Sequence, residues 1–162
     1  MATMLHLELT KEALPLTRLV DELRATATRL GLFAREIEFP DPAHNLIHLT
    51  SGLLVDAGPP VVSGEDPFVA DFGMARAATV DFTYDSQHEG FERQHDELLR
   101  IVFGLLEVIP GDAVLHYEFF VVHLARLGGR LVLSDAEDLW PPEELVRVPA
   151  PYERAPLAFR TM

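Results

Sequence analysis

The sequence contains no cysteine and a single lysine, Lys11. Without cysteine the chain cannot form a disulfide, a thiolate metal site or a cysteine nucleophile. No apolar run approaches the ~20 residues that a membrane-spanning helix needs. Met1 is not followed by a basic segment and an apolar block, so no signal peptide is expected. These absences favour a soluble cytoplasmic protein.

Basic residues are also scarce. The 162-residue chain has 13 Lys+Arg against 26 Asp+Glu, a formal net charge of −13. This balance disfavours binding to nucleic acid or to anionic membrane surfaces. It permits a basic protein partner, although an acidic surface that serves solubility alone is common. With 48% hydrophobic residues the chain is long enough for one domain with a substantial core, so we expect a single domain over residues 1–162.

The motifs of common catalytic sites are missing as well. None of the four serines, which are Ser51, Ser63, Ser86 and Ser134, lies in a Gly-x-Ser-x-Gly nucleophile motif. There is no Gly-rich phosphate-binding loop. The Asp-Phe-Gly sequence at residues 71–73 matches a kinase motif only superficially, because its companion elements are absent. The sequence therefore gives no support for these classes of enzyme.

The longest helical pattern lies between Ser86 and Ile109. Ser86 and Glu89 fit a capping box, and apolar residues from Phe91 to Ile109 recur on one side at helical spacing. Pro110-Gly111 ends the pattern, and the apolar run that follows Asp112 is typical of a strand. We predict a deeply buried helix that begins at Ser86 and leads into this strand.

Alternation of apolar and polar residues predicts most of the sheet. It is clearest in residues 5–10 and 79–85, and it is typical of a strand with one buried face. Further strands are expected over residues 33–39, 46–49, 53–57, 113–117, 120–127 and 131–133. Gly128-Gly129 predicts a two-residue hairpin turn, because both positions of a type I′ turn need positive φ. We therefore predict three consecutive antiparallel strands within residues 112–134.

A first helix is expected from Pro15, since proline suits the first helical position, to Gly31, which suits a left-handed cap. Residues 135–162 are expected to form a largely irregular tail packed on the body, with one helical turn after Pro141-Pro142. This order of elements predicts an α+β fold of two layers: a mainly antiparallel sheet with two principal helices on one face.

One alternative function is a small metal-assisted enzyme. His88, Glu92 and His95 are spaced i, i+4, i+7 on the central helix and could hold a divalent metal. A zinc site needs three or four convergent ligands, and no fourth ligand or catalytic water site can be named. Half-buried histidines beside an apolar stripe are ordinary. We therefore expect neither a metal nor a cofactor.

A second group of carboxylates lies on a predicted strand. Asp81, Thr83 and Asp85 share its polar face, and Glu118 could join them if the strands pair. Paired carboxylates can perform acid–base chemistry when burial separates their pKa values. A solvated strand face is the more common explanation.

Two aromatic residues and an acidic cluster are candidates for partner binding. Phe103 projects from the polar face of the central helix, and Trp140 lies beside Asp135, Glu137 and Asp138. Each aromatic residue either packs under the tail or contacts a partner. We favour packing, and the acidic cluster is the candidate contact surface.

Several short motifs occur together in the second half of the chain. They are residues 69–73 with the strand at 79–82, residues 110–115, residues 126–129 with the strand at 131–133, and residues 138–142 with Pro151-Tyr152. The series resembles the immunity proteins of the swarming-inhibition toxin (Sit) systems, which bacteria use against their kin. The resemblance implies a cytoplasmic, non-enzymatic protein that binds and neutralises a cognate toxin. The acidic excess of this chain suggests that the toxin is basic.

Overall fold

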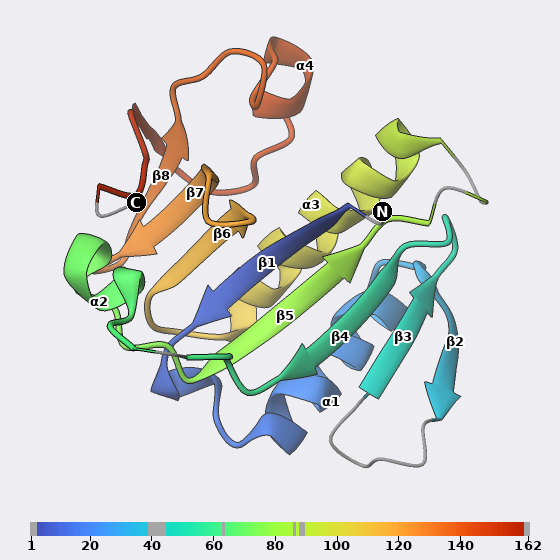
Figure 1. Ribbon diagram of the computed structural model, residues 1–162. Helices are drawn as coiled ribbons and strands as arrows, with labels where there is room; N and C mark the ends of the chain where they lie inside the picture. The colour runs from blue at the N-terminus through green and yellow to red at the C-terminus, as the bar shows by residue number, and fades with distance from the viewer. Residues whose placement is uncertain (1–2, 39–44, 63, 86, 88–89, 161–162) are drawn as a thin grey trace.

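The computed structural model describes residues 3–38, 45–62, 64–85, 87 and 90–160. These residues form nine strands in one sheet, ordered β2-β3-β4-β5-β1-β6-β7-β8-β9 (Figure 1). Neighbouring strands are antiparallel except for β8 and β9, which are parallel. The strands are β1 Met4–Leu9, β2 Phe33–Glu38, β3 Asn45–Leu49, β4 Leu54–Gly58, β5 Ala78–Thr83, β6 Ala113–Tyr117, β7 Val121–Leu127, β8 Arg130–Ser134 and β9 Glu153–Ala155.

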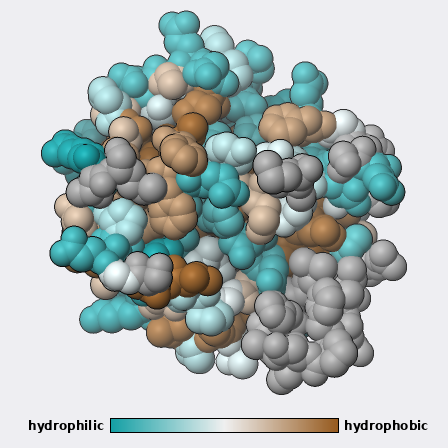
Figure 2. Space-filling model, viewed as in Figure 1, coloured by the Kyte–Doolittle hydropathy of each residue, from teal (hydrophilic) through white to brown (hydrophobic). Residues whose placement is uncertain are grey.

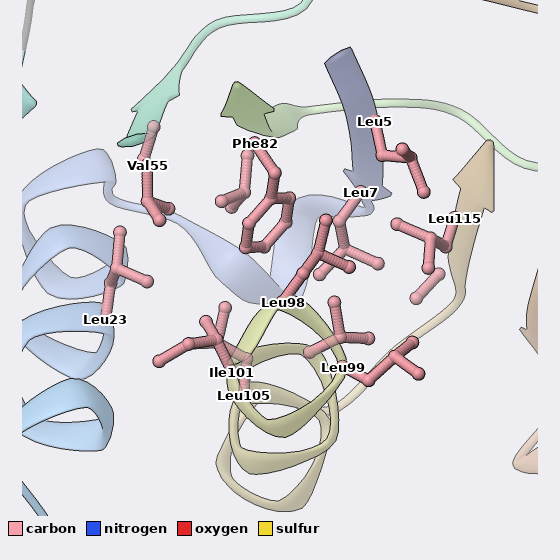
Figure 3. Packing of buried hydrophobic residues seen from close by; sticks show 14 of the residues in the cluster. Leu5, Leu7, Leu23, Val55, Phe82, Leu98, Leu99, Ile101, Leu105 and Leu115 are labelled. Carbon is pink, nitrogen blue, oxygen red and sulfur yellow. The ribbon is translucent and has the colours of Figure 1, made fainter. Parts of the chain in front are cut away.

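The two long helices, α1 (Leu16–Arg29) and α3 (Phe91–Val108), lie behind the sheet in the view of Figure 1. A short 3-10 helix, η1 (Lys11–Ala13), precedes α1. Alternate residues of the strands point at these helices: Leu5, Leu7 and Phe82 pack against Leu98 and Ile101 (Figure 3). This arrangement confirms the predicted α+β fold with two principal helices on one face.

The three strands predicted within residues 112–134 are confirmed as β6, β7 and β8. Leu127 pairs with Arg130 across the turn, and Gly128 and Gly129 have φ values of 58° and 80°. Both glycines therefore have the left-handed conformation that the turn requires. The first helix also begins close to the predicted place, with Pro15 as its N-cap residue.

The predicted start of the central helix at Ser86 is wrong, because α3 begins at Phe91 with Gly90 as its N-cap. Ser86 and Glu89 themselves lie outside the described residues. The Gln94 side chain accepts a hydrogen bond from the Asp85 N–H and donates one to the Asp85 carbonyl, each at 2.8 Å. These bonds hold the chain just after β5 against the first turn of α3. Phe91, predicted to face the core, is 59% exposed.

Besides η1, two elements were not predicted. The helix α2 (Pro67–Phe72) begins where Asp66 accepts a hydrogen bond from the Phe68 N–H, and it ends at Gly73, which has a φ of 61°. Its signals are present in the sequence, because Asp-Pro suits a helix start and glycine suits a helix end. The second element, β9, lies in the tail. The tail also contains the predicted helical turn, α4 (Pro142–Leu145).

The second face of the sheet carries its own small core. Phe68 of α2 and Met74 pack on Val114, Val122 and Ala125 of β6 and β7. Partly buried side chains of the turn after β6 and of the tail complete this core, among them Phe119, Leu157 and Phe159. A second layer therefore covers part of the face that alternation alone predicts to be solvated.

Candidate functional site

The acidic residues proposed for partner binding lie just beyond β8. Asp135, Glu137 and Asp138 are all exposed. The backbone that carries them is ordered by hydrogen bonds: the Asp135 N–H donates to the Ala155 carbonyl at 3.0 Å, and the Ala136 N–H donates to the Ser134 hydroxyl at 3.2 Å. We call residues 135–138 the acidic segment. It presents three carboxylates on a fixed piece of chain at one edge of the sheet.

Trp140, two residues after this segment, packs near Phe103 of α3. Trp140 is 2% exposed, and its indole N–H donates to the His123 carbonyl at 2.7 Å. The Phe103 ring is partly buried, and its centroid is 6.2 Å from that of Trp140. Both aromatic residues therefore pack in this structure, and Trp140 anchors the chain that follows the acidic segment.

A pocket of about 210 Å³ opens beside Phe103 on the outer side of α3. Its apolar lining comes from Leu30, Leu99, Phe103, Gly104 and Pro149, and its charged lining from Arg29, Asp96, Arg100, Glu107, Glu144 and Arg147. Arg147 pairs with Asp96 across it. The pocket is smaller than the ~300 Å³ at which small-molecule sites begin. It suits a single protruding side chain better than a substrate.

The metal alternative finds no matching geometry in the described part of the chain. His88 lies outside the described residues, and Glu92 is exposed. His95 is engaged elsewhere: its Nδ1 is 2.7 Å from the Tyr84 hydroxyl, and its Nε2 is 3.8 Å from a Glu144 oxygen. Burial lowers the pKa of His95 although Asp96 acts to raise it. Among the described residues no group of three or more His, Asp or Glu could hold a metal ion.

Two carboxylates of the predicted strand face, those of Asp81 on β5 and Glu118 in the turn after β6, both lie near His6 of β1. Asp81 Oδ1 is 2.5 Å from His6 Nδ1, and a Glu118 oxygen is 3.9 Å from His6 Nε2. Burial acts to lower the pKa of His6, but the hydrogen bond and charge of Asp81, with Glu8 and Glu118, raise it overall. The Asp85 backbone binds the Gln94 side chain, and the Asp85 carboxylate accepts a hydrogen bond from the Gln87 N–H at 2.9 Å.

A buried ionic network lies next to His6 and was not predicted. One Glu8 oxygen accepts from the Arg76 guanidinium at 3.3 Å and lies 3.2 Å from His116 Nε2. The other oxygen accepts from the Thr79 hydroxyl at 2.7 Å. Arg76 also donates to Asp66 at 3.0 Å and lies 4.5 Å from the centre of the Phe68 ring.

This network is closed to solvent. The side chains of Glu8 and Arg76 are only 3% and 4% exposed. Burial lowers the pKa of His116, although Glu8 acts to raise it. Because both carboxylate oxygens of Glu8 have protein partners and no open surface, the network suits a structural role. Strand periodicity places Glu8 on the polar face, but it cannot reveal that α2 and the tail cover that face.

A family model described as SitI3-like matches residues 7–144, from β1 to α4. The chain belongs to the SitI3-like family. This membership is consistent with the resemblance to Sit immunity proteins and suggests an immunity-protein role. No curated protein and no solved structure matches the chain. The matched region contains the buried network, the turn after β6, the acidic segment and Trp140. In the described part of this SitI3-like protein no helix is long and apolar enough to cross a membrane.

Proposed function

We propose that this SitI3-like protein is a non-enzymatic immunity protein that binds a cognate toxin in the cytoplasm and neutralises it. The observation that carries the proposal is the family match across residues 7–144. The buried network adds support, because its charged groups bind one another and leave no oxygen of Glu8 open to a substrate.

The net charge of this chain indicates the charge of its partner. A net charge of −13 favours encounter with a basic toxin domain, and complementary charge raises the rate of association more than the final affinity. We propose that Asp135, Glu137 and Asp138 form part of the contact surface. Buried Trp140, whose indole N–H donates to the His123 carbonyl, anchors the chain that follows this surface. The pocket beside Phe103 is the next candidate should the acidic segment prove uninvolved.

Growth of cells that produce the toxin tests this function. A candidate toxin domain, sought among the genes that neighbour the gene for this chain, is expressed in a susceptible bacterium, with or without the chain. Co-expression should restore growth, whereas an unrelated acidic protein of similar size and charge should not. The proposal is wrong if the chain gives no protection although both proteins are produced in folded form.

A further inference from the structure

The turn between β6 and β7 exposes two aromatic side chains. Phe120 is 75% exposed and Tyr117 is 37% exposed. They stand at the two ends of the same tight turn, in which the Phe120 N–H donates to the Tyr117 carbonyl at 2.9 Å. Single exposed apolar residues are ordinary, but two aromatic side chains on one turn give a partner a compact apolar anchor.

The backbone of this turn is strained. Glu118 and Phe119 have φ values of 49° and 63°, in the left-handed region that non-glycine residues rarely adopt. The Phe119 ring is held in the second core, 5.8 Å from Phe68 and 4.8 Å from His116. With Phe119 fixed inward, the chain turns so that Phe120 projects into solvent. Strain of this kind is often maintained where a protein contacts a ligand or partner.

The acidic segment and the turn between β6 and β7 lie at the same end of the strands. Since β7 is antiparallel to both neighbours, the start of β7, the end of β6 and the end of β8 all meet there (Figure 1). Glu118, within the turn, adds a carboxylate with a half-exposed side chain. On the face of the molecule seen in Figure 2, the half that contains β6–β8 exposes a mixture of hydrophobic and hydrophilic residues. The two exposed aromatic residues thus lie at the same end of the strands as the Glu118 carboxylate and the acidic segment.

We propose that Tyr117 and Phe120 anchor the toxin, and that the toxin surface they meet carries arginine or lysine side chains around an apolar depression. This inference rests on the proposed immunity function and names the surface that performs it. Exposed aromatic residues at the centre of a contact, with charged residues at its rim, match the general anatomy of protein interfaces. Arginine suits the site because it pairs with carboxylates and stacks on aromatic rings.

A second copy of this chain is a less suitable occupant. Each copy has a formal net charge of −13, and the residues around the turn are acidic. Two such surfaces repel each other. A basic toxin therefore fits the charge of this surface, and self-association becomes an outcome that the experiment can detect.

The test measures binding of the purified toxin domain to the variant Tyr117→Ser/Phe120→Ser by surface plasmon resonance. The matched control is Val61→Ser/Val62→Ser, which removes two exposed valines beyond Gly58, at the opposite edge of the sheet. We expect the turn variant to raise the Kd for the toxin by about tenfold or more, mainly through faster dissociation. The control should bind like the wild type.

A second variant, Glu118→Asn, tests whether toxin binding can change while the fold stays intact. Asparagine tolerates positive φ better than glutamate, so this variant should have a higher melting temperature. It also removes the Glu118 carboxylate from the turn, so it should associate more slowly with the basic toxin. If the double variant does not fold, Phe120→Ser alone is measured, because this side chain is largely in solvent. Unchanged toxin binding by a folded turn variant, or loss of self-association instead of toxin binding, would overturn the inference while the proposed function stands. If the wild type does not bind the toxin, both are wrong.

Discussion

Gly104 of α3 lies so close to α1 that a Cβ atom at this position would be 2.5 Å from Thr26 Cγ2. Cβ atoms do not approach other heavy atoms so closely, so the two helices can pack at this distance only because residue 104 has no side chain. Thr26 is itself fully buried, and its hydroxyl has no hydrogen-bond partner among the described residues. This contact fixes the spacing of the helical layer.

Gly104→Ala should therefore destabilise the fold by about 1–3 kcal/mol, the usual cost of overpacking, less the gain of roughly 1 kcal/mol from the higher helix propensity of alanine. In a Thr26→Ser background, which lacks Cγ2, the same substitution should be neutral or stabilising. Urea unfolding of the four proteins measures this coupling. Equal effects of Gly104→Ala in both backgrounds would show that the two residues do not constrain each other.

Gly129→Val should destabilise the β7–β8 hairpin by about 1–2 kcal/mol, because a β-branched residue is strained at a φ of 80°. A Cβ atom on Gly129 meets nothing within 4 Å, so the loss comes from the backbone alone. The control, Gly129→Asn, should cost less, since asparagine tolerates this region. Thermal unfolding compares the two, and an equally stable valine variant contradicts the backbone argument.

Arg76→Met should cost about 3–5 kcal/mol, because it leaves the buried Glu8 carboxylate without its cationic partner. The matched control is Arg130→Met, which breaks the exposed Arg130–Glu153 pair and should cost far less stability. Adding Glu8→Gln to Arg76→Met should recover part of the loss. Urea unfolding of these variants tests the network, and similar costs at the two arginines would show that burial of the ion pair is unimportant.

The folded protein should lose stability as the pH falls below about 6.5, the ordinary pKa of histidine. Burial lowers the pKa of His123 to about 4, helped by His95 and His116 and opposed by Asp138. The pKa values of His95 and His116 are also lowered by burial. Between these values and 6.5 the unfolded chain binds protons that the folded chain does not, which favours unfolding. His6 acts in the opposite direction, since its pKa is raised.

Urea unfolding at pH 7.5 and 5.5 checks this expectation. A His123→Asn variant cannot titrate at residue 123 and should lose less stability over the same interval than the wild type does. The comparison removes the contribution of the carboxylates, which both proteins share. Equal losses in the two proteins would mean that His123 takes up its proton as readily in the folded state as in the unfolded state.

The triple substitution Asp135→Asn, Glu137→Gln, Asp138→Asn should slow association with the toxin more than it speeds dissociation, and it should weaken the salt dependence of the association rate. The fold should be unaffected, because the three side chains are exposed. Stopped-flow mixing at several salt concentrations measures both rates. Unchanged rates and salt dependence would show that the acidic segment is solvated surface outside the contact.

The sheet and its helical layer could be predicted from the sequence because each depends on local periodicity. Alternation marked Val80 and Phe82, both fully buried, and the paired glycines marked the β7–β8 turn. The start of α3 could not be predicted reliably, because Ser86 offers a local capping pattern that the Asp85–Gln94 hydrogen bonds override.

The contacts on the second face of the sheet could not be predicted from local sequence patterns. Glu8 finds Arg76 at a sequence separation of 68 residues and His116 at 108, and such partners leave no periodic signal. The exposed aromatic turn was missed for a related reason. Phe120 was predicted within a strand, whereas β7 begins at Val121 because the turn occupies the preceding residues. The acidic segment was recognisable because charge needs no long-range partner to be seen.

Titration of purified toxin with purified chain tests the central claim, neutralisation by binding, most directly. Toxin activity should fall in proportion to the chain added and reach zero at a fixed molar ratio, with a complex of that ratio visible by light scattering. The surviving activity at each ratio should not change with time. Absence of a complex, or continuing inactivation of the toxin by a small fraction of its molar amount of chain, would contradict the account and indicate an enzyme.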